Sequence, residues 1–557
     1  MRRLILIGLL TVFWMQVIAD GTPPDGLGTE TAPYLIESLD NLLWLSTTDS
    51  VWCIGNYFEQ TQDIDASSTQ DWNNGAGFIP IGTDYYHPFQ GDYNGDSYFI
   101  NNLYINRPNS NYIGLFGHTM YAKIENLSLI NVNITGDERV GAMVGRNYGT
   151  SIINCHTSGS VNGINRIGGL VGATYAASYI SGCNSSCNVE GVDYIGGLAG
   201  YHREDSHIWE SYATGEISGY YRIGGLVGYN YKDSQIHLCY SSGNVEGTEN
   251  VGGLVGYNEY DSEVKKSYAT GNVTGSDHYI GGLIGRNYDS TISECFAMGT
   301  VVGIGYIGGL IGRNYTSEIS NCYALGDVSG NGIAGGLIGS NTSYALISNC
   351  YTCGSVSVAN DSGGMLGSNS WSSIENSIWN IETTGQAHAI GSVFYSTENN
   401  LLGKTTAEMQ EMSTYTDIGW DFSGENINGT LDIWTINSSI NNGFPYLFCI
   451  ELPGEGGESE ILNTRIIFDL KASPNPFNPR TTISFDLIQD TSYLKISIYN
   501  IRGQKVWQRS IVSAVSGRHS YIWRGNNSKG QPVASGIYFY RISVPTDCRS
   551  GKVVLLK

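Results

Sequence analysis

A short glycine-rich string returns through the middle of the chain at nearly constant intervals, and this regularity restricts the fold more than any other feature. The string reads Ile-Gly-Gly-Leu-Val-Gly or a close variant, and the steps between its first glycines are 27, 27, 28, 28, 28, 29, 27, 27 and 28 residues. Such a period is typical of solenoids, in which each unit stacks on the next. The ten first glycines are Gly114, Gly141, Gly168, Gly196, Gly224, Gly252, Gly281, Gly308, Gly335 and Gly363.

Each repeat also has a constant interior. An asparagine usually stands six residues after the first glycine, an aromatic residue follows it, and a β-favouring stretch and a Gly-Asn-Val-type segment come next. Three short alternating segments separated by turn residues predict one coil of a solenoid. We therefore expect an all-β fold in which residues 111–370 form a parallel β-helix of about ten coils. The glycines would lie where backbone crowds backbone, and the asparagines would form a stacked amide ladder.

Cysteines follow the same register. Cys155, Cys183, Cys239, Cys295, Cys322 and Cys350 lie 14 or 15 residues after a repeat glycine, and serine takes this place in two other copies. Exchange with serine indicates a site for a small residue, so these cysteines are interpreted as buried free thiols. The chain has 11 cysteines, an odd number, so at least one of them lacks a partner within the chain.

The repeat resembles the GLUG motif family, which is named for its Gly-Leu-any-Gly core. The resemblance covers residues 110 to 370 and implies a bacterial surface or secreted protein; some relatives are metallopeptidases that cleave immunoglobulins. Residues 20–110 and 371–450 are interpreted as caps, because the ends of a solenoid need cover against edge-to-edge aggregation.

The N-terminus has the features of a secretory signal peptide. Arg2 and Arg3 precede an uncharged, mostly apolar run that ends at Ile18. We expect residues 1–19 to be removed by cleavage between Ala19 and Asp20. The alternative, a membrane anchor, needs about 20 apolar residues, and this run is shorter. No other run approaches that length, so the sequence predicts an exported protein with no integral membrane span.

The last part of the chain differs in both pattern and charge. Residues 451–462 form an acidic, Gly-rich linker, and residues 463–557 alternate in the manner of about seven strands. This segment holds 14 Lys and Arg against 4 Asp and Glu, whereas the chain as a whole has a net charge of -22. The pattern predicts a separate immunoglobulin-like β-sandwich.

Four motifs in this segment resemble the type A C-terminal sorting domain of type IX secretion substrates and, as a second possibility, the related domain of flagellar hook-capping proteins. The sorting resemblance implies that the type IX machinery carries the chain across the outer membrane of a Gram-negative-type bacterium, after which it is released or fixed at the surface. The motif residues are Asn475, Pro476, Phe477, Asn478, Pro479, Gly503, Trp523, Gly525, Gly536 and Tyr538.

The sequence offers little catalytic chemistry. The net charge of -22 argues against nucleic-acid binding. The nine histidines never form His-Glu-x-x-His, so the metallopeptidase chemistry of some relatives does not carry over. Cys350-x-x-Cys353 lacks the second pair of a zinc site, and we expect no catalytic residue, cofactor or metal. Carboxylates at the repeat turns, Glu204, Asp205, Glu259, Asp261 and Glu263, are interpreted as solvated turn residues.

Tyrosines are the candidates for ligand contact. The periodic column from Tyr231 to Tyr315 is interpreted as a stacking ladder, and the less regular Tyr220, Tyr221 and Tyr279 as exposed contacts. The sequence thus favours a non-enzymatic, exported β-solenoid for adhesion to, or recognition of, an unknown glycan or protein. A secreted enzyme acting on polysaccharide or protein and an inert surface spacer are the alternatives.

Overall fold

A computed structural model describes residues 21–358, 360–423, 425, 427–429, 432–448, 467–487, 490–500, 505–544 and 547–556. Ala19, Asp20, Gly503 and the predicted linker lie outside the described residues. The chain divides into two compact units, Met1–Gly419 and Trp420–Lys557. Each unit is described by itself.

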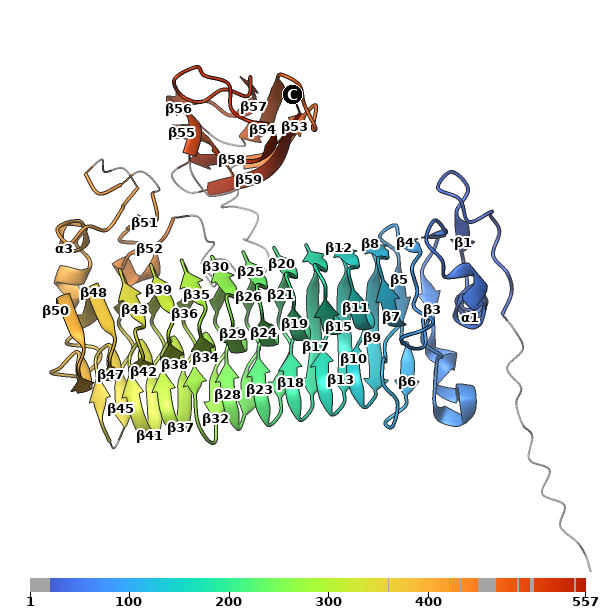
Figure 1. Cartoon of the computed structure of the whole chain (residues 1–557), viewed down its shortest axis with the longest axis horizontal. Helices are drawn as coiled ribbons and strands as arrows, with labels where there is room; N and C mark the ends of the chain where they lie inside the picture. Colours follow the sequence, from blue (N-terminus) through green and yellow to red (C-terminus); the bar gives the residue numbers. More distant parts are fainter. Residues whose placement is uncertain are drawn as a thin grey trace, which may run out of the picture. The chain divides into compact units, whose positions relative to one another are not determined.

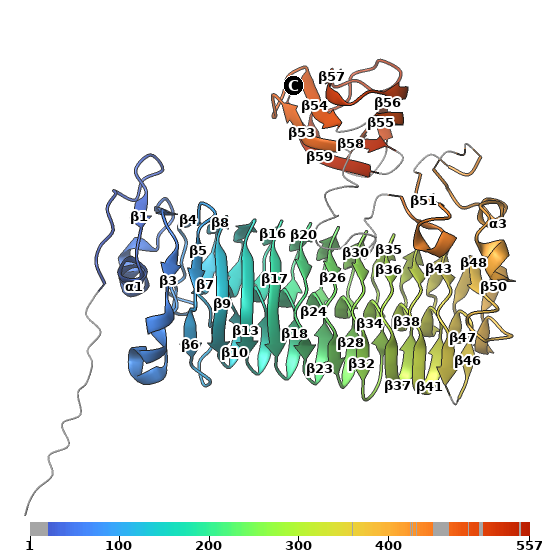
Figure 2. The ribbon, with the colours of Figure 1, turned by 180° about the vertical axis from the view of Figure 1, so that it is seen from behind.

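The first unit is a parallel β-solenoid of about 13 turns, so the predicted all-β fold and β-helix are confirmed. Figures 1 and 2 show the strands of successive coils side by side, with helix α1 (Leu39–Thr47) towards one end and helix α3 (Ser413–Thr416) towards the other. One coil contains β24 (Val227–Tyr231), β25 (Gln235–His237), β26 (Tyr240–Ser241), β27 (Val245–Gly247) and β28 (Glu249–Gly252).

One strand from each of eleven coils belongs to a separate 11-stranded parallel sheet, and the other strands of the solenoid form a 39-stranded sheet. The 11-stranded sheet consists of β7 (Phe116–Met120), β11 (Val144–Tyr148), β15 (Val171–Tyr175), β19 (Ala199–Arg203), β24, β29 (Val255–Glu259), β34 (Ile284–Tyr288), β38 (Ile311–Tyr315), β42 (Ile338–Thr342), β47 (Leu366–Ser370) and β49 (Ile390–Phe394).

The repeat glycines align in a column, as the spacing predicts. Gly224 pairs in register with Gly252, and Gly252 with Gly281. The adjoining glycine of the motif has a steric role. A Cβ atom on Gly253 would lie 2.0 Å from the carbonyl oxygen of Gly282 in the next coil, so no side chain fits there.

The predicted asparagine ladder is present inside the solenoid. The Nδ2 of Asn230 donates to the Oδ1 of Asn258 over 2.7 Å, and Asn258 donates to Asn287 over 2.8 Å. The pattern continues through Asn314 and Asn341 to Asn369 over 2.9, 2.9 and 3.0 Å. All six side chains are buried. Since every bond joins two coils, the ladder fixes their register.

The ladder ends where the repeat sequence departs from asparagine. His202 lies beside Asn230 and Val393 lies beside Asn369. Consequently, among the described residues, the Oδ1 of Asn230 and the Nδ2 of Asn369 have no hydrogen-bond partner. His202 is itself buried and bonds to the hydroxyl of Thr174 and the carbonyl of Ser206, over 2.6 and 3.0 Å. Burial lowers the pKa of this imidazole to about 3.

The cysteines of the repeat register are free and buried, which confirms the interpretation drawn from their spacing. Burial raises the pKa of the Cys239 thiol to about 12. In two coils serine replaces cysteine without breaking the column, and the backbone N–H of Cys239 donates to the Ser267 hydroxyl over 3.1 Å. These thiols are therefore small core residues of the solenoid.

The number of coils differs from the expected ten, because the parallel ladder extends into both segments interpreted as caps. Near the N-terminus β1 (Tyr34–Ile36), β2 (Tyr57–Gln60), β4 (Asp92–Asn94) and β8 (Lys123–Glu125) pair in parallel. At the other end β48 (Ser373–Asn380) pairs with β50 (Thr397–Lys404). These outer coils differ in length from the repeat and lack its glycine string, so the period does not reveal them.

The second unit contains the predicted small β-sandwich. A three-stranded antiparallel sheet consists of β53 (Ile467–Ser473), β54 (Thr481–Leu487) and β57 (Gly517–Trp523). A four-stranded antiparallel sheet consists of β56 (Lys505–Ala514), β55 (Thr491–Asn500), β58 (Gly536–Val544) and β59 (Asp547–Leu555). Apolar residues of both sheets share one core.

The described motif residues lie in this core and at its edges. The Asn475 side chain bonds to the carbonyl of Lys552 and the N–H of Val554, each over 2.9 Å, and so attaches the Asn475–Pro479 segment to β59. The Phe477 ring packs 5.3 Å from Trp523, and Trp523 packs 5.1 Å from Tyr538. These motif residues therefore stabilise the sandwich.

The ladder geometry predicts an effect of replacing His202 by the asparagine found in most copies. The new amide can donate to the free Oδ1 of Asn230, so His202→Asn should raise the free energy of unfolding at pH 7 by about 1 kcal/mol. A histidine of the unfolded chain binds its proton near pH 6.5, whereas His202 in the folded chain does so only near pH 3. The wild type therefore loses stability as the pH falls between these values, and the variant should lose less.

Urea unfolding measured from pH 7.5 to pH 4 tests this expectation. The exposed His388, changed to Asn, is the matched control and should leave the pH profile as in the wild type. Part of the acid sensitivity should persist in His202→Asn, because burial also lowers the pKa of His118, to about 4. An unaltered acid slope in His202→Asn would show that the buried imidazole does not couple folding to pH.

Candidate functional site

The outer surface of the 11-stranded sheet is the most distinctive surface of the solenoid. Because side chains alternate along a strand, the residues on either side of each inward asparagine point outwards. In three copies the string Arg-Asn-Tyr occupies these places. We call this surface the tyrosine–arginine face. It comprises Arg146, Tyr148, Tyr175, Tyr201, Arg203, Tyr229, Tyr231, Tyr257, Arg286, Tyr288, Arg313 and Tyr315. Arg139, Arg166, Tyr194, Arg222 and Tyr306, on the strands that lead into the sheet, and Tyr279, directly before such a strand, complete the face.

Tyrosines at the centre of this face pack in a row along the solenoid. Tyr175, Tyr201, Tyr229 and Tyr257 belong to one apolar cluster. The centroids of successive rings lie 5.9, 5.3 and 5.3 Å apart. The rings bury one another although they point away from the core, so the face is rigid and largely aromatic.

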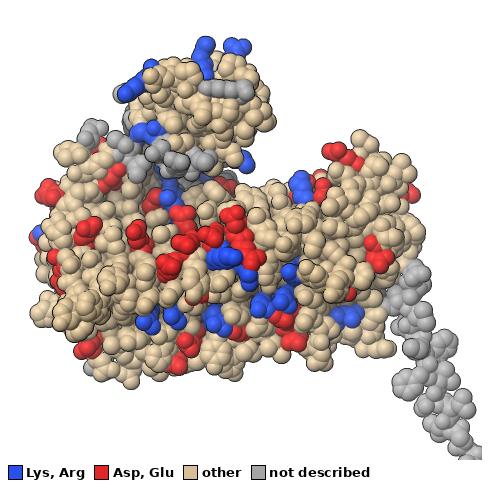
Figure 3. Space-filling model, in the orientation of Figure 1, with Lys and Arg blue, Asp and Glu red and all other residues tan. Residues whose placement is uncertain are grey.

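Arginines lie over these rings in cation–π geometry. The guanidinium carbon of Arg166 is 5.1 Å from the Tyr201 ring centroid, and that of Arg222 is 4.1 Å from the Tyr194 centroid. Several of the arginines are also neutralised by carboxylates. Arg139 and Arg166 pair with Glu138, Arg203 with Glu204, and Arg222 with Asp193. In the view of Figure 3, basic side chains are spread along the solenoid and a band of acidic side chains runs beside them.

The carboxylate of Glu259 has a different position from the one expected. The residue is at the end of β29 and is only 9% exposed, so its interpretation as a solvated turn residue is wrong. Its two oxygens accept hydrogen bonds from the hydroxyls of Tyr229 and Tyr257. Burial and this carboxylate together raise the pKa of both tyrosines. Asp205 and Asp261 are exposed at turns, as expected.

The structure separates the three tyrosines that the sequence singled out as contacts. Tyr220 and Tyr221 are 58% and 45% exposed at a corner of one coil. Tyr279 is half-buried within the tyrosine–arginine face, two repeats further along. It stacks on Tyr306 at 5.8 Å and accepts a hydrogen bond from Arg313 over 3.0 Å. The arginines of this face were not predicted, although the recurring Arg-Asn-Tyr string was the available signal.

A second aromatic column runs along the 39-stranded sheet. Its successive ring centroids lie 4.6, 5.0, 4.7, 4.8 and 5.0 Å apart with nearly parallel planes. The column consists of Tyr212, Tyr240, Tyr268, Phe296, Tyr323 and Tyr351. One stacked ring per coil is the arrangement expected of a structural ladder.

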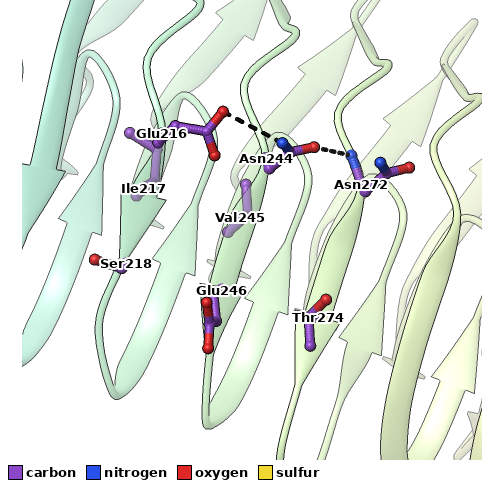
Figure 4. A pocket seen from close by; sticks show the side chains of 8 residues that line it. All are labelled: Glu216, Ile217, Ser218, Asn244, Val245, Glu246, Asn272 and Thr274. Atoms are coloured by element: carbon purple, nitrogen blue, oxygen red, sulfur yellow. Dashed lines mark hydrogen bonds between the residues drawn. The ribbon is translucent and has the colours of Figure 1, made fainter.

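An open depression of about 370 Å³ lies on the same large sheet, where β27 is flanked by β22 (Ile217–Ser218) and β32 (Val273–Gly275). Figure 4 shows its upper edge, at which the Asn244 amide donates to Glu216 over 3.2 Å and the Asn272 N–H donates to the Asn244 side chain over 3.1 Å. These bonds link neighbouring coils, so the polar groups of this edge serve the ladder.

The described part of the chain holds no group of three or more His, Cys, Asp or Glu side chains placed to bind one metal ion. Among the same residues we find no helix both long and apolar enough to cross a membrane.

Comparisons with known proteins agree with the two units. Residues 219–246, 247–274, 276–302 and 303–329 match the GLUG motif, and residues 475–547 match the FlgD Ig-like domain. The GLUG matches lie within the predicted repeat region, and they show that GLUG motif repeats are present. The Ig-like match agrees with the two antiparallel sheets near the C-terminus.

The chain is similar to parts of much longer proteins. It is 39% identical over 154 residues to halomucin from Haloquadratum walsbyi, which covers 27% of this chain and 2% of halomucin. It is 35% identical over 185 residues to a protein described as a Gly-rich membrane protein from Evansella cellulosilytica, covering 26% of this chain and 20% of that one. Among solved structures, an IgA1 protease is 18% identical with a TM-score of 0.31, covering 57% of this chain and 21% of the other. The chain thus spans a small part of the curated relatives it matches.

Proposed function

We propose that this chain is an exported, non-enzymatic protein of the cell surface that binds a glycan or protein through the side of its solenoid. The observation that carries the proposal is the tyrosine–arginine face. The GLUG repeats support a surface or secreted setting, as do the names of the two relatives, halomucin and a Gly-rich membrane protein.

The chemistry of the face suits recognition. Tyr and Arg are enriched at the positions that supply most of the binding energy in protein interfaces, and flat tyrosine rings also suit sugar rings. The strands and the mutual packing of the rings hold these side chains in place, so little conformational entropy is lost on binding. The buried carboxylate at the centre of the face, Glu259, already accepts two tyrosine hydroxyls, an arrangement that favours a structural role.

Binding should depend on Tyr279, which lies within the tyrosine–arginine face, and on the exposed Tyr220 and Tyr221 at a corner of one coil. Changing Tyr220, Tyr221 and Tyr279 together to Ala should weaken binding of the purified protein on a glycan array or to a host-surface protein severalfold or more. Loss of Tyr220 and Tyr221 should leave the unfolding temperature nearly unchanged, because both are exposed. Loss of Tyr279 should lower the unfolding temperature, because this residue stacks on Tyr306 and accepts a hydrogen bond from Arg313. The matched control is Tyr86→Ala, which removes a tyrosine that is 83% exposed and lies outside the GLUG repeats.

Two results would contradict this function. Release of products from a polysaccharide or protein, abolished by changing Asp205 or Asp261 to Asn, would indicate an enzyme. Absence of binding to every glycan and protein tested would indicate an inert spacer.

The C-terminal sandwich is proposed to be the export address. Its support is the Ig-like match and the resemblance of its motifs to type A sorting domains. Together with the predicted signal peptide it would take the chain through the inner membrane and then, by the type IX machinery, through the outer membrane.

Deleting residues 463–557 should therefore leave the protein in the periplasm, and fusing this segment to a carrier with a signal peptide should move the carrier to the cell surface or the medium. Protease accessibility on intact cells measures both. Surface display that continues after the deletion would contradict the proposal.

A further inference from the structure

We propose that Arg286 and Arg313, with the tyrosine pairs on both sides of them, bind an anionic sugar residue, that is, a pyranose ring bearing a carboxylate or sulfate. The inference rests on the proposed function, because it assigns a ligand class to one part of the tyrosine–arginine face.

The two arginines form a pair of like charges. They occupy the same position of adjacent strands, β34 and β38, and pair in register. Adjacent strands lie about 4.8 Å apart, so the two guanidinium groups extend side by side from the sheet. Both side chains are half-buried, which reduces the screening of their mutual repulsion by water.

No carboxylate neutralises this pair. Other arginines of the face, such as Arg166, Arg203 and Arg222, pair with Glu or Asp. Within the part of the chain that the structure describes, neither Arg286 nor Arg313 makes an ion pair, and the buried Nε of Arg286 has no hydrogen-bond partner. Arg313 donates to the Tyr279 hydroxyl over 3.0 Å.

Glu259 and Asp289, the acidic residues next to this pair in the repeat register, do not supply the missing charge. Glu259 is in register with Tyr288, and its oxygens already accept the hydroxyls of Tyr229 and Tyr257. Asp289 is exposed at the turn that follows β34. A guanidinium has five N–H donors, so the pair retains donors for an incoming anion.

Stacked tyrosines lie on both sides of the pair. Tyr288 and Tyr315 stack at 4.9 Å with an angle of 2°, and Tyr279 and Tyr306 stack at 5.8 Å with an angle of 8°. Arg286 lies 4.8 Å from the Tyr257 centroid, 5.4 Å from the Tyr279 centroid and 5.9 Å from the Tyr288 centroid. Arg313 lies 5.4 Å from the Tyr279 centroid and 5.5 Å from the Tyr315 centroid. A strip of positive charge therefore runs between two aromatic walls.

This arrangement fits an acidic polysaccharide better than an acidic protein. A sugar ring can lie on a tyrosine pair while its carboxylate or sulfate reaches the two guanidinium groups. An extended peptide usually adds to a free sheet edge, whereas β34 and β38 are paired on both sides by β29 and β42.

The test compares the full chain with the double variant Arg286→Gln, Arg313→Gln. The probes are polygalacturonate, methyl-esterified polygalacturonate, dextran sulfate, dextran and poly-glutamate, measured by isothermal titration calorimetry. The wild type should bind the two anionic glycans at least tenfold more tightly than their neutral counterparts and than poly-glutamate. The double variant should lose at least tenfold in affinity for the anionic glycans.

The matched control is the double variant Arg524→Gln, Lys529→Gln, which removes the same number of positive charges from exposed positions outside the tyrosine–arginine face. This control should bind as the wild type does. A second readout guards against misfolding, because dextran sulfate should raise the unfolding temperature of the wild type and of the control but not that of Arg286→Gln, Arg313→Gln.

Three outcomes would overturn the inference. Poly-glutamate binding as tight as that of the glycans would show a site for charge alone. Equal loss in Arg524→Gln, Lys529→Gln would show a diffuse charge effect. If the wild type bound neutral glycans or proteins and the arginine double variant bound them equally well, recognition would lie elsewhere on the chain and the proposed function would stand. If the wild type bound no ligand, both the inference and the proposed function would be contradicted.

Discussion

The hydrogen bond from one asparagine side chain to the next is the interaction on which the rest of the solenoid depends. The ladder from Asn230 to Asn369 lies inside the coil, where an amide without a partner costs about 1–3 kcal/mol. Each amide finds its partner only if the neighbouring coil has the same register. The glycine column adds a steric condition, since a Cβ at Gly253 would meet the next backbone. Together they allow one alignment of the coils.

The outer face follows from this inner constraint. Once the asparagine points inwards, the residues before and after it must point outwards in columns, and those columns contain tyrosine and arginine. A one-residue slip would bring these large side chains into the core and expose the amides. The sheet thus holds aromatic rings and charged groups at the spacing of the strands, so a ligand could contact them on an open surface rather than in a cleft. Surface recognition, rather than chemistry in a pocket, is the kind of function that such a face supports.

Much of the fold could be predicted from the sequence, because a repeat shows the same local constraint ten times. The glycine column, the asparagine ladder and the buried thiols all follow from spacing alone. The outer coils could not be predicted in this way, since Phe58 pairs with Tyr93 across a longer loop that breaks the period. The prediction of a solvated turn for Glu259 was wrong, because the burial of its carboxylate depends on tyrosines of two coils. The lack of a counter-charge at Arg286 and Arg313 could be recognised only in the structure, because ion pairing depends on which side chains are neighbours on adjacent strands.

Removal of one whole coil tests the register most directly. Ile280 and Ile307 hold equivalent places in adjacent coils, so deleting residues 281–307 joins matching backbone and lets Asn258 bond to Asn314. We predict that this variant keeps the β-sheet circular dichroism spectrum and the cooperative unfolding of the parent. Deleting residues 281–294 removes half a coil, and we expect it to abolish cooperative unfolding. If the two deletions behaved alike, the in-register ladder would not be what holds the solenoid together.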